Sequence, residues 1–138
     1  MQWVTFCLAD EKYAINVMRV QEIMRVTEIT PVPGAPSYVL GIINLRGKVV
    51  TVIDTHKRFG LDSITADDSS SIVIIETEAH VIGFLVDSVA EVIEMRASEI
   101  EVAPNFGNEE AAKYVQGVTE RNNELLILVD LNKFLNDD

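Results

Sequence analysis

Apolar and polar residues alternate along the first strand-sized segment of the chain. In residues 3–8, Val4, Phe6 and Leu8 share one face of an extended chain, as a period of two requires. Further short runs rich in Val, Ile and Leu are typical of buried strands. They cover residues 12–17, 49–53, 72–75, 81–86 and 125–129. The pattern predicts a mainly β protein.

Helical periodicity is confined to short segments. Val17, Val20, Ile23 and Met24 fit one face of a two-turn helix, with Asn16 as its N-cap. A capping-box spacing over residues 88–91 predicts that a second helix begins there. We therefore expect only a few short helices.

The chain also contains an internal repeat. Residues 38–59 align without a gap on residues 114–135, and residues 14–24 align on residues 83–93. The identical pairs of the first alignment are Tyr38/Tyr114, Val39/Val115, Gly41/Gly117, Asp54/Asp130 and Lys57/Lys133. Such a period indicates duplication of a structural unit. The residue pattern within each copy predicts, in this order, a strand, a short helix, a loop, a hairpin and a further short helix.

A polar segment rich in Ser and Asp, residues 60–71, separates the two copies. We expect one domain over residues 1–138, with a first lobe within residues 10–68 and a second within 69–138. The N-terminal strand can pack with either lobe. Two small β lobes side by side leave a groove, which is a natural place for binding.

The repeat separates structural residues from candidates for function. Asp54 recurs in the second copy and predicts a helix N-cap in both. Gly47 aligns with Asn123, and both suit the left-handed backbone of a tight hairpin. Gly41 also recurs and predicts a bulge or a close backbone approach. Residues 44–46, Asn-Leu-Arg, align with Glu-Arg-Asn. This tripeptide, where the copies differ most, is freer to serve function.

Composition and charge exclude several kinds of partner. Of the 138 residues, 48% are hydrophobic, which supports a folded core. The chain has 11 basic and 22 acidic residues and a net charge of −11, so phosphate backbones and anionic lipid surfaces repel it. No apolar run approaches the roughly 20 residues of a membrane helix. We expect a cytoplasmic protein with no nucleic acid partner and no direct membrane insertion.

Catalytic and metal-binding patterns are missing from the sequence. Asp54 and His56 lie two residues apart, which leaves a hydrolase open, but the simpler interpretation is a helix cap followed by a solvated histidine. Cys7 is the single cysteine, and no metal-ligand or phosphate-loop spacing occurs. We therefore expect no catalytic residues, no metal and no cofactor, and a binding role.

The order of motifs resembles the CheW family of chemotaxis coupling proteins over essentially the whole chain. The Asn-Leu-Arg-Gly hairpin at residues 44–47 is its most specific part. The other matching segments are residues 6–15, 20–23, 33–36, 41–43, 52–54, 83–89 and 125–131. The resemblance implies two five-stranded SH3-like β-barrels and no enzymatic activity.

The resemblance also implies partners and contact residues. Members of the family bridge transmembrane chemoreceptors to the histidine kinase CheA, which places this chain at membrane-associated receptor arrays. The implied contacts with the receptor's cytoplasmic hairpin tip are Val20, Glu22, Ile23, Val39, Gly41, Asn44, Leu45 and Arg46. The implied contacts with the regulatory domain of CheA are Ile29, Val32, Val49 and Phe106. We expect a monomer in isolation.

Three alternatives stay open at this point. The same adaptor role can serve a pilus or biofilm circuit. The groove can instead bind a small molecule, and Asp54 with His56 can form a hydrolytic site. Arg46 can pair with Glu22 within the protein or with a receptor carboxylate, and the sequence does not choose between them.

Overall fold

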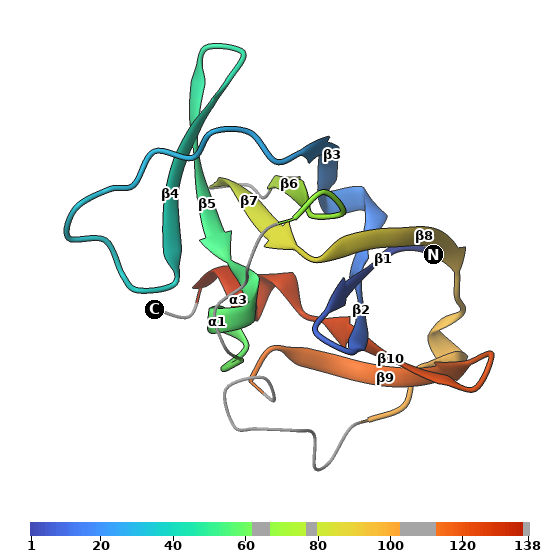
Figure 1. Ribbon diagram of the computed structural model, residues 1–138. Coiled ribbons are helices and arrows are strands. Elements are labelled where there is room, and N and C mark those ends of the chain that lie inside the picture. Colours follow the sequence, from blue (N-terminus) through green and yellow to red (C-terminus); the bar gives the residue numbers. More distant parts are fainter. Residues whose placement is uncertain (62–66, 77–79, 103–112, 137–138) are drawn as a thin grey trace.

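The computed structural model describes residues 1–61, 67–76, 80–102 and 113–136, and it contains ten strands and few helices (Figure 1). The strands are β1 (Gln2–Leu8), β2 (Glu11–Asn16), β3 (Val20–Arg25), β4 (Val39–Leu45), β5 (Lys48–Asp54), β6 (Ser71–Glu76), β7 (Val81–Val86), β8 (Ser88–Glu94), β9 (Val115–Arg121) and β10 (Glu124–Val129). The helices are η1 (Val17–Arg19), α1 (Thr55–Arg58), η2 (Ala97–Glu99) and α3 (Leu131–Asn136). The predicted mainly β class is confirmed.

The strands form two five-stranded sheets. The first sheet, which forms the first lobe, has the order β3-β6-β7-β5-β4. The second sheet, which forms the second lobe, has the order β8-β1-β2-β10-β9. Neighbours are antiparallel except for β5 with β7 and β2 with β10, which are parallel. The repeat relates β3 to β8, β7 to β2, β5 to β10 and β4 to β9, so the two sheets match position for position. The predicted pair of five-stranded lobes is therefore confirmed.

The two halves of the chain exchange their first hairpins. β1 and β2 join the sheet of β8, β9 and β10, whereas β6 and β7 join the sheet of β3, β4 and β5. The strands thus do not follow the division expected between residues 68 and 69. The physical reason is that the chain passes to the other sheet after β2, through η1, and again after β7, at Asp87. Each sheet needs residues from both halves.

Apolar side chains gather in three clusters. The largest includes Phe6, Tyr13, Ile75, Phe84 and Ile127, and it draws on both sheets, on α3 and on the residue that directly follows α1. Smaller clusters belong to one sheet each, around Ile72 and Val52 in the first and Trp3 and Leu128 in the second. α1 and α3 lie next to each other, with the rings of Phe59 and Phe134 5.3 Å apart (Figure 1). The largest cluster therefore holds the two lobes together.

Two segments that the sequence pattern predicts as helices form strands in the structure. Asn16 does cap a helix, because its Oδ1 accepts a hydrogen bond from the backbone N–H of Met18 at 2.9 Å, but that helix is the single turn η1. Residues 20–25 then pair with β6 as an edge strand, and residues 88–94 pair with β1. The sequence prediction fails in both places because pairing with strands distant in the sequence overrides local periodicity.

The predicted caps and turns are confirmed. The carboxylate of Asp54 accepts a hydrogen bond from the N–H of Lys57, and its counterpart Asp130 does the same for Lys133, each at 3.2 Å. Gly41 permits a close approach, since a Cβ there would lie 2.2 Å from the carbonyl oxygen of Thr30. The recurring residues thus have a structural role in both lobes.

Candidate functional site

The β4–β5 hairpin ends in the tightest kind of turn. Leu45 pairs with Lys48, so only Arg46 and Gly47 form the loop. Their φ angles are 51° and 84°, as a type I′ turn requires. The side-chain oxygen of Asn44 accepts a hydrogen bond from the N–H of Gly47 at 3.0 Å. This geometry holds Arg46 at the exposed tip.

An ion pair joins the two edges of the first sheet. β3 and β4 are opposite edge strands, yet the guanidinium of Arg46 reaches the carboxylate of Glu22 on β3 through both of its terminal nitrogens. The contact raises the pKa of Arg46, because the hydrogen bonds and the negative charge of Glu22 favour the protonated form. In the unbound protein Arg46 therefore pairs internally.

The second lobe builds the same turn from different residues. Arg121 pairs with Glu124, and the loop residues Asn122 and Asn123 have φ angles of 52° and 66°. Asparagine tolerates this left-handed conformation well, whereas an arginine there is uncommon. Arg46 thus occupies a position where the backbone alone favours Asn or Gly, and strain of this kind is typical of functional positions.

Two cavities flank the first hairpin. A cavity of about 550 Å³ is lined by Gln21, Leu45, Arg46, Lys48, Val49, Val50, Glu76 and Val81. A second, of about 440 Å³, is lined by Thr27, Glu28, Thr30, Ile42, Ile43, Asn44 and Val49. Val49 lines both and leaves 67% of its surface exposed. The hairpin therefore presents an apolar side chain between two hollows, with the cations Arg46 and Lys48 beside one of them.

The structure divides the predicted receptor contacts into two groups. Glu22, Asn44, Leu45 and Arg46 gather at the hairpin end of the first sheet. Val20 and Val39 instead pack against the largest apolar cluster, at the start of their strands. Of the remaining two, Gly41 is buried and Ile23 is 44% exposed on the edge strand β3. Only part of the set is thus brought together around the ion pair.

The predicted kinase contacts differ in exposure. Ile29 is half-buried against the apolar cluster of the first sheet. Val32 is 42% exposed and Val49 is 67% exposed. Phe106 lies outside the described residues. Val32 and Val49 are therefore available at the surface, whereas Ile29 serves the interior as well.

The interpretation of His56 as a solvated side chain is wrong. His56 is only 9% exposed, and its Nε2 lies 3.1 Å from both carboxylate oxygens of Asp87. Asp54 meanwhile caps α1. Within the part of the chain that the structure describes, no group of three or more His, Cys, Asp or Glu could hold a metal ion. His56 and Asp87 thus form a contact between elements.

Several residues of the site escaped the sequence analysis. Gln21, Glu76 and Val81 line the larger cavity beside the hairpin, but nothing in the sequence places β6 and β7 next to β3 and β5. Lys48 could have been found, because it directly follows the Asn-Leu-Arg-Gly turn. Arg58 of α1, which lines neither cavity, was also missed; its guanidinium lies 4.4 Å from the ring centre of Tyr38 and 5.3 Å from that of Tyr114.

The fold and the hairpin define a class of protein, a β module of two paired lobes with polar and apolar side chains around a tight hairpin at the end of one lobe. No helix within the described ranges is long and apolar enough to cross a membrane. The model of the CheW-like domain family matches residues 2–138. The chain therefore belongs to the CheW family.

Relatives from several bacteria extend this similarity. The chain is 31% identical over 137 residues to the chemotaxis protein CheW of Klebsiella aerogenes, covering 99% of this chain and 82% of that one. It is 35% identical to the same-named protein of Treponema pallidum, with 96% and 80% covered. The crystal structure of the scaffolding protein TtCheW from Thermoanaerobacter tengcongensis is 33% identical, with a TM-score of 0.89 over 99% of this chain and 93% of that one.

Proposed function

We propose that the chain is a non-enzymatic scaffold that couples transmembrane chemoreceptors to the histidine kinase CheA. The single observation that carries the proposal is the asymmetry of the two hairpins. The first lobe places the charged Arg46 in a left-handed turn where the second lobe has Asn122. A strained arginine at an exposed tip is well suited to contact a partner.

The receptor contact uses the hairpin end of the first lobe. The cytoplasmic tip of a chemoreceptor is a helical hairpin, and an apolar surface with a few charged anchors accepts such a helix. Glu22, Leu45 and Arg46 supply the anchors, while Asn44 keeps the turn in shape. On binding, a receptor carboxylate can take over one of the donors with which Arg46 now holds Glu22.

The kinase contact uses exposed apolar residues of the same lobe. Val32 and Val49 bind the regulatory domain of CheA, with Ile29 supporting the surface from below, and Phe106 supplies a further contact. Both partners then meet one small module, which is recruited from the cytoplasm to membrane-associated arrays without entering the bilayer.

A reconstituted kinase assay tests the proposal. Purified protein, a receptor cytoplasmic fragment and CheA from the same organism are combined, and autophosphorylation is measured with each component left out in turn. We expect strong stimulation only when all three are present. Arg46→Ala should abolish most of it, whereas Asn122→Ala, the same turn position in the other lobe, should retain it.

The same assay separates the alternatives. An equal loss of kinase stimulation in Arg46→Ala and Asn122→Ala would contradict the role of Arg46. No stimulation by the wild-type chain, with all components folded and a coupling protein of known activity as positive control, would contradict the chemotaxis assignment. Receptors of a pilus or biofilm circuit would then be tested in the same format.

A further inference from the structure

The cavity of about 550 Å³ beside the β4–β5 hairpin, which we call the hairpin cavity, has a counterpart in the second lobe. Strands β5 and β7 pair in the first lobe as β10 and β2 do in the second, and in the same register. Residues at equivalent places therefore line both cavities. The three pairs that differ in charge, with the residue of the hairpin cavity first, are Arg46 and Asn122, Lys48 and Glu124, and Val81 and Lys12.

The second lobe closes its own cavity with an ion pair. The Nζ of Lys12 on β2 lies 2.8 Å from the Oε2 of Glu124 on β10. The contact raises the pKa of Lys12, because the hydrogen bond and the negative charge of Glu124 favour the ammonium form. Only about 30 Å³ of cavity is left beside this pair. The two side chains thus take up space that the first lobe leaves open.

The first lobe lacks the corresponding ion pair. Val81 stands where the second lobe has Lys12, and its apolar side chain offers no charge to Lys48, the counterpart of Glu124. Lys48 is exposed and makes no ion pair with any residue that the structure describes. The hairpin cavity therefore combines an unpaired ammonium group with apolar walls, to which Val50 and Val81 contribute.

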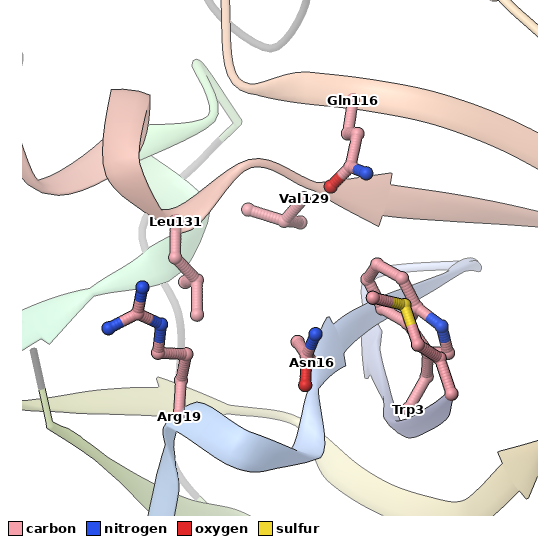
Figure 2. A pocket seen from close by; sticks show the side chains of 7 residues that line it. Trp3, Asn16, Arg19, Gln116, Val129 and Leu131 are labelled. Atoms are coloured by element: carbon pink, nitrogen blue, oxygen red, sulfur yellow. The ribbon is translucent and has the colours of Figure 1, made fainter. Parts of the chain in front are cut away.

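Another cavity of the second lobe, of about 160 Å³, shows no such arrangement (Figure 2). Its polar lining includes Arg19, Asn16 and Gln116. Figure 2 shows the guanidinium of Arg19 on the far side of Leu131, turned away from both amides, so the three groups do not meet on one small ligand. The hairpin cavity is the stronger candidate, because the space open there is filled by a charged side chain in the other lobe.

We propose that the hairpin cavity receives an acidic side chain of the chemoreceptor tip, and that Lys48 binds its carboxylate. The inference rests on the proposed coupling function, whose receptor contacts Leu45 and Arg46 line the same cavity. The acidic side chain of the receptor would meet Lys48 as Lys12 meets Glu124, with the two charges exchanged. Walls of low polarity strengthen a charge-assisted hydrogen bond of this kind.

Glu76 makes the sign of the partner's charge testable. It lies on β6 directly opposite Val81, it is exposed, and it lines the same cavity. A carboxylate at this place repels an acidic side chain that enters the cavity and attracts a basic one. Neutralising Lys48 and neutralising Glu76 should therefore change the affinity for the receptor in opposite directions.

Calorimetric titration of the full chain with a purified receptor cytoplasmic fragment, at fixed ionic strength, tests the contact without the kinase. Lys48→Gln should weaken binding by about tenfold, because it removes a charge-assisted hydrogen bond. Glu76→Gln should bind at least as tightly as the wild type. Lys133→Gln makes the same change in net charge as Lys48→Gln, at an exposed residue of α3, and should bind as the wild type does.

Transfer of the second-lobe ion pair into the first lobe tests the cavity itself. The double variant with Lys48→Glu and Val81→Lys places a glutamate and a lysine where the second lobe has Glu124 and Lys12. We expect it to fold as the wild type does, by circular dichroism, and to lose binding of the receptor fragment by tenfold or more. Retained binding in this folded variant would overturn the proposal.

The remaining outcomes separate this contact from the coupling function. Unchanged affinity in Lys48→Gln, or weaker binding in Glu76→Gln than in the wild type, would overturn the contact and leave the coupling function standing. Failure of the wild-type chain to bind the receptor fragment would contradict both. Binding of the CheA regulatory domain should be equal in Lys48→Gln and the wild type. A loss there, with receptor binding unchanged, would assign the cavity to the kinase and overturn the proposal.

Discussion

His56 of α1 contacts Asp87 at the crossover between β7 and β8, with Nε2 3.1 Å from each carboxylate oxygen. The same carboxylate accepts a hydrogen bond from the N–H of Ala9 at 2.7 Å, in the β1–β2 turn. α1 follows a strand of the first sheet, whereas that turn belongs to the second. Asp87 thus ties the two lobes together where the chain crosses between them.

Replacement of Asp87 by Ala should therefore destabilise the whole protein. It leaves the Ala9 N–H and the His56 ring without their shared acceptor, and a loss of this kind costs about 1–3 kcal/mol. Urea unfolding at neutral pH would measure the change in free energy of unfolding. Asp10→Ala, at an exposed residue of the same turn, is the matched control. Equal free energies of unfolding for Asp87→Ala and Asp10→Ala would contradict the stabilising role of Asp87 between the lobes.

The exchange of hairpins predicts that the lobes unfold together. Ile72 is fully buried in the apolar cluster of the first sheet, whereas Trp3 lies in the cluster of the second. Ile72→Ala should cost roughly 2–5 kcal/mol. Because β6 and β7 come from the half of the chain that builds most of the other sheet, Trp3 fluorescence should report the same lowered urea midpoint as circular dichroism. A Trp3 midpoint that stays at its wild-type value would show independent lobes.

Most strands could be predicted from the sequence, because alternation and Val- and Ile-rich runs depend on neighbours within the same strand. The lobe pair followed from the repeat. The two edge strands β3 and β8 could not be recognised, because their extended conformation depends on pairing with β6 and β1. The hairpin exchange is likewise a property of tertiary pairing, and the strands of a duplicated sequence pair equally well within or between copies.

The candidate site was predictable only where the two copies of the repeat differ. Arg46 stood out because residues 44–46 differ most from their counterparts in the second copy, and because the Asn-Leu-Arg-Gly hairpin is the most specific part of the resemblance. Lys48 directly follows the same turn. Asp87 and His56 carried no such signal, since they lie 31 residues apart and meet only in the folded chain.

Tyr13 should make the protein sensitive to alkaline pH. Burial among apolar side chains raises the pKa of its phenol above the ordinary value of about 10. Above about pH 10 the unfolded chain loses this proton while the folded chain keeps it, so stability falls as pH rises. Tyr13→Phe removes this contribution. Urea unfolding between about pH 8 and about pH 11 should show a shallower decline in the variant, and parallel declines would contradict the interpretation.

Arg46→Asn should separate stability from function. The variant gives the first hairpin the turn residue of the second, and Asn adopts the left-handed conformation more readily than Arg. The lost ion pair with Glu22 is exposed, and exposed pairs contribute little to folding. We therefore expect a melting temperature at or above that of the wild type, together with strongly reduced receptor-dependent stimulation of the kinase. Asn122→Arg, the reverse exchange in the second lobe, should lower the melting temperature without affecting stimulation. Retained stimulation of the kinase by Arg46→Asn would show that the receptor does not recognise the arginine. A melting temperature below that of the wild type would show that the ion pair with Glu22 contributes more to the stability of this turn than the backbone conformation does.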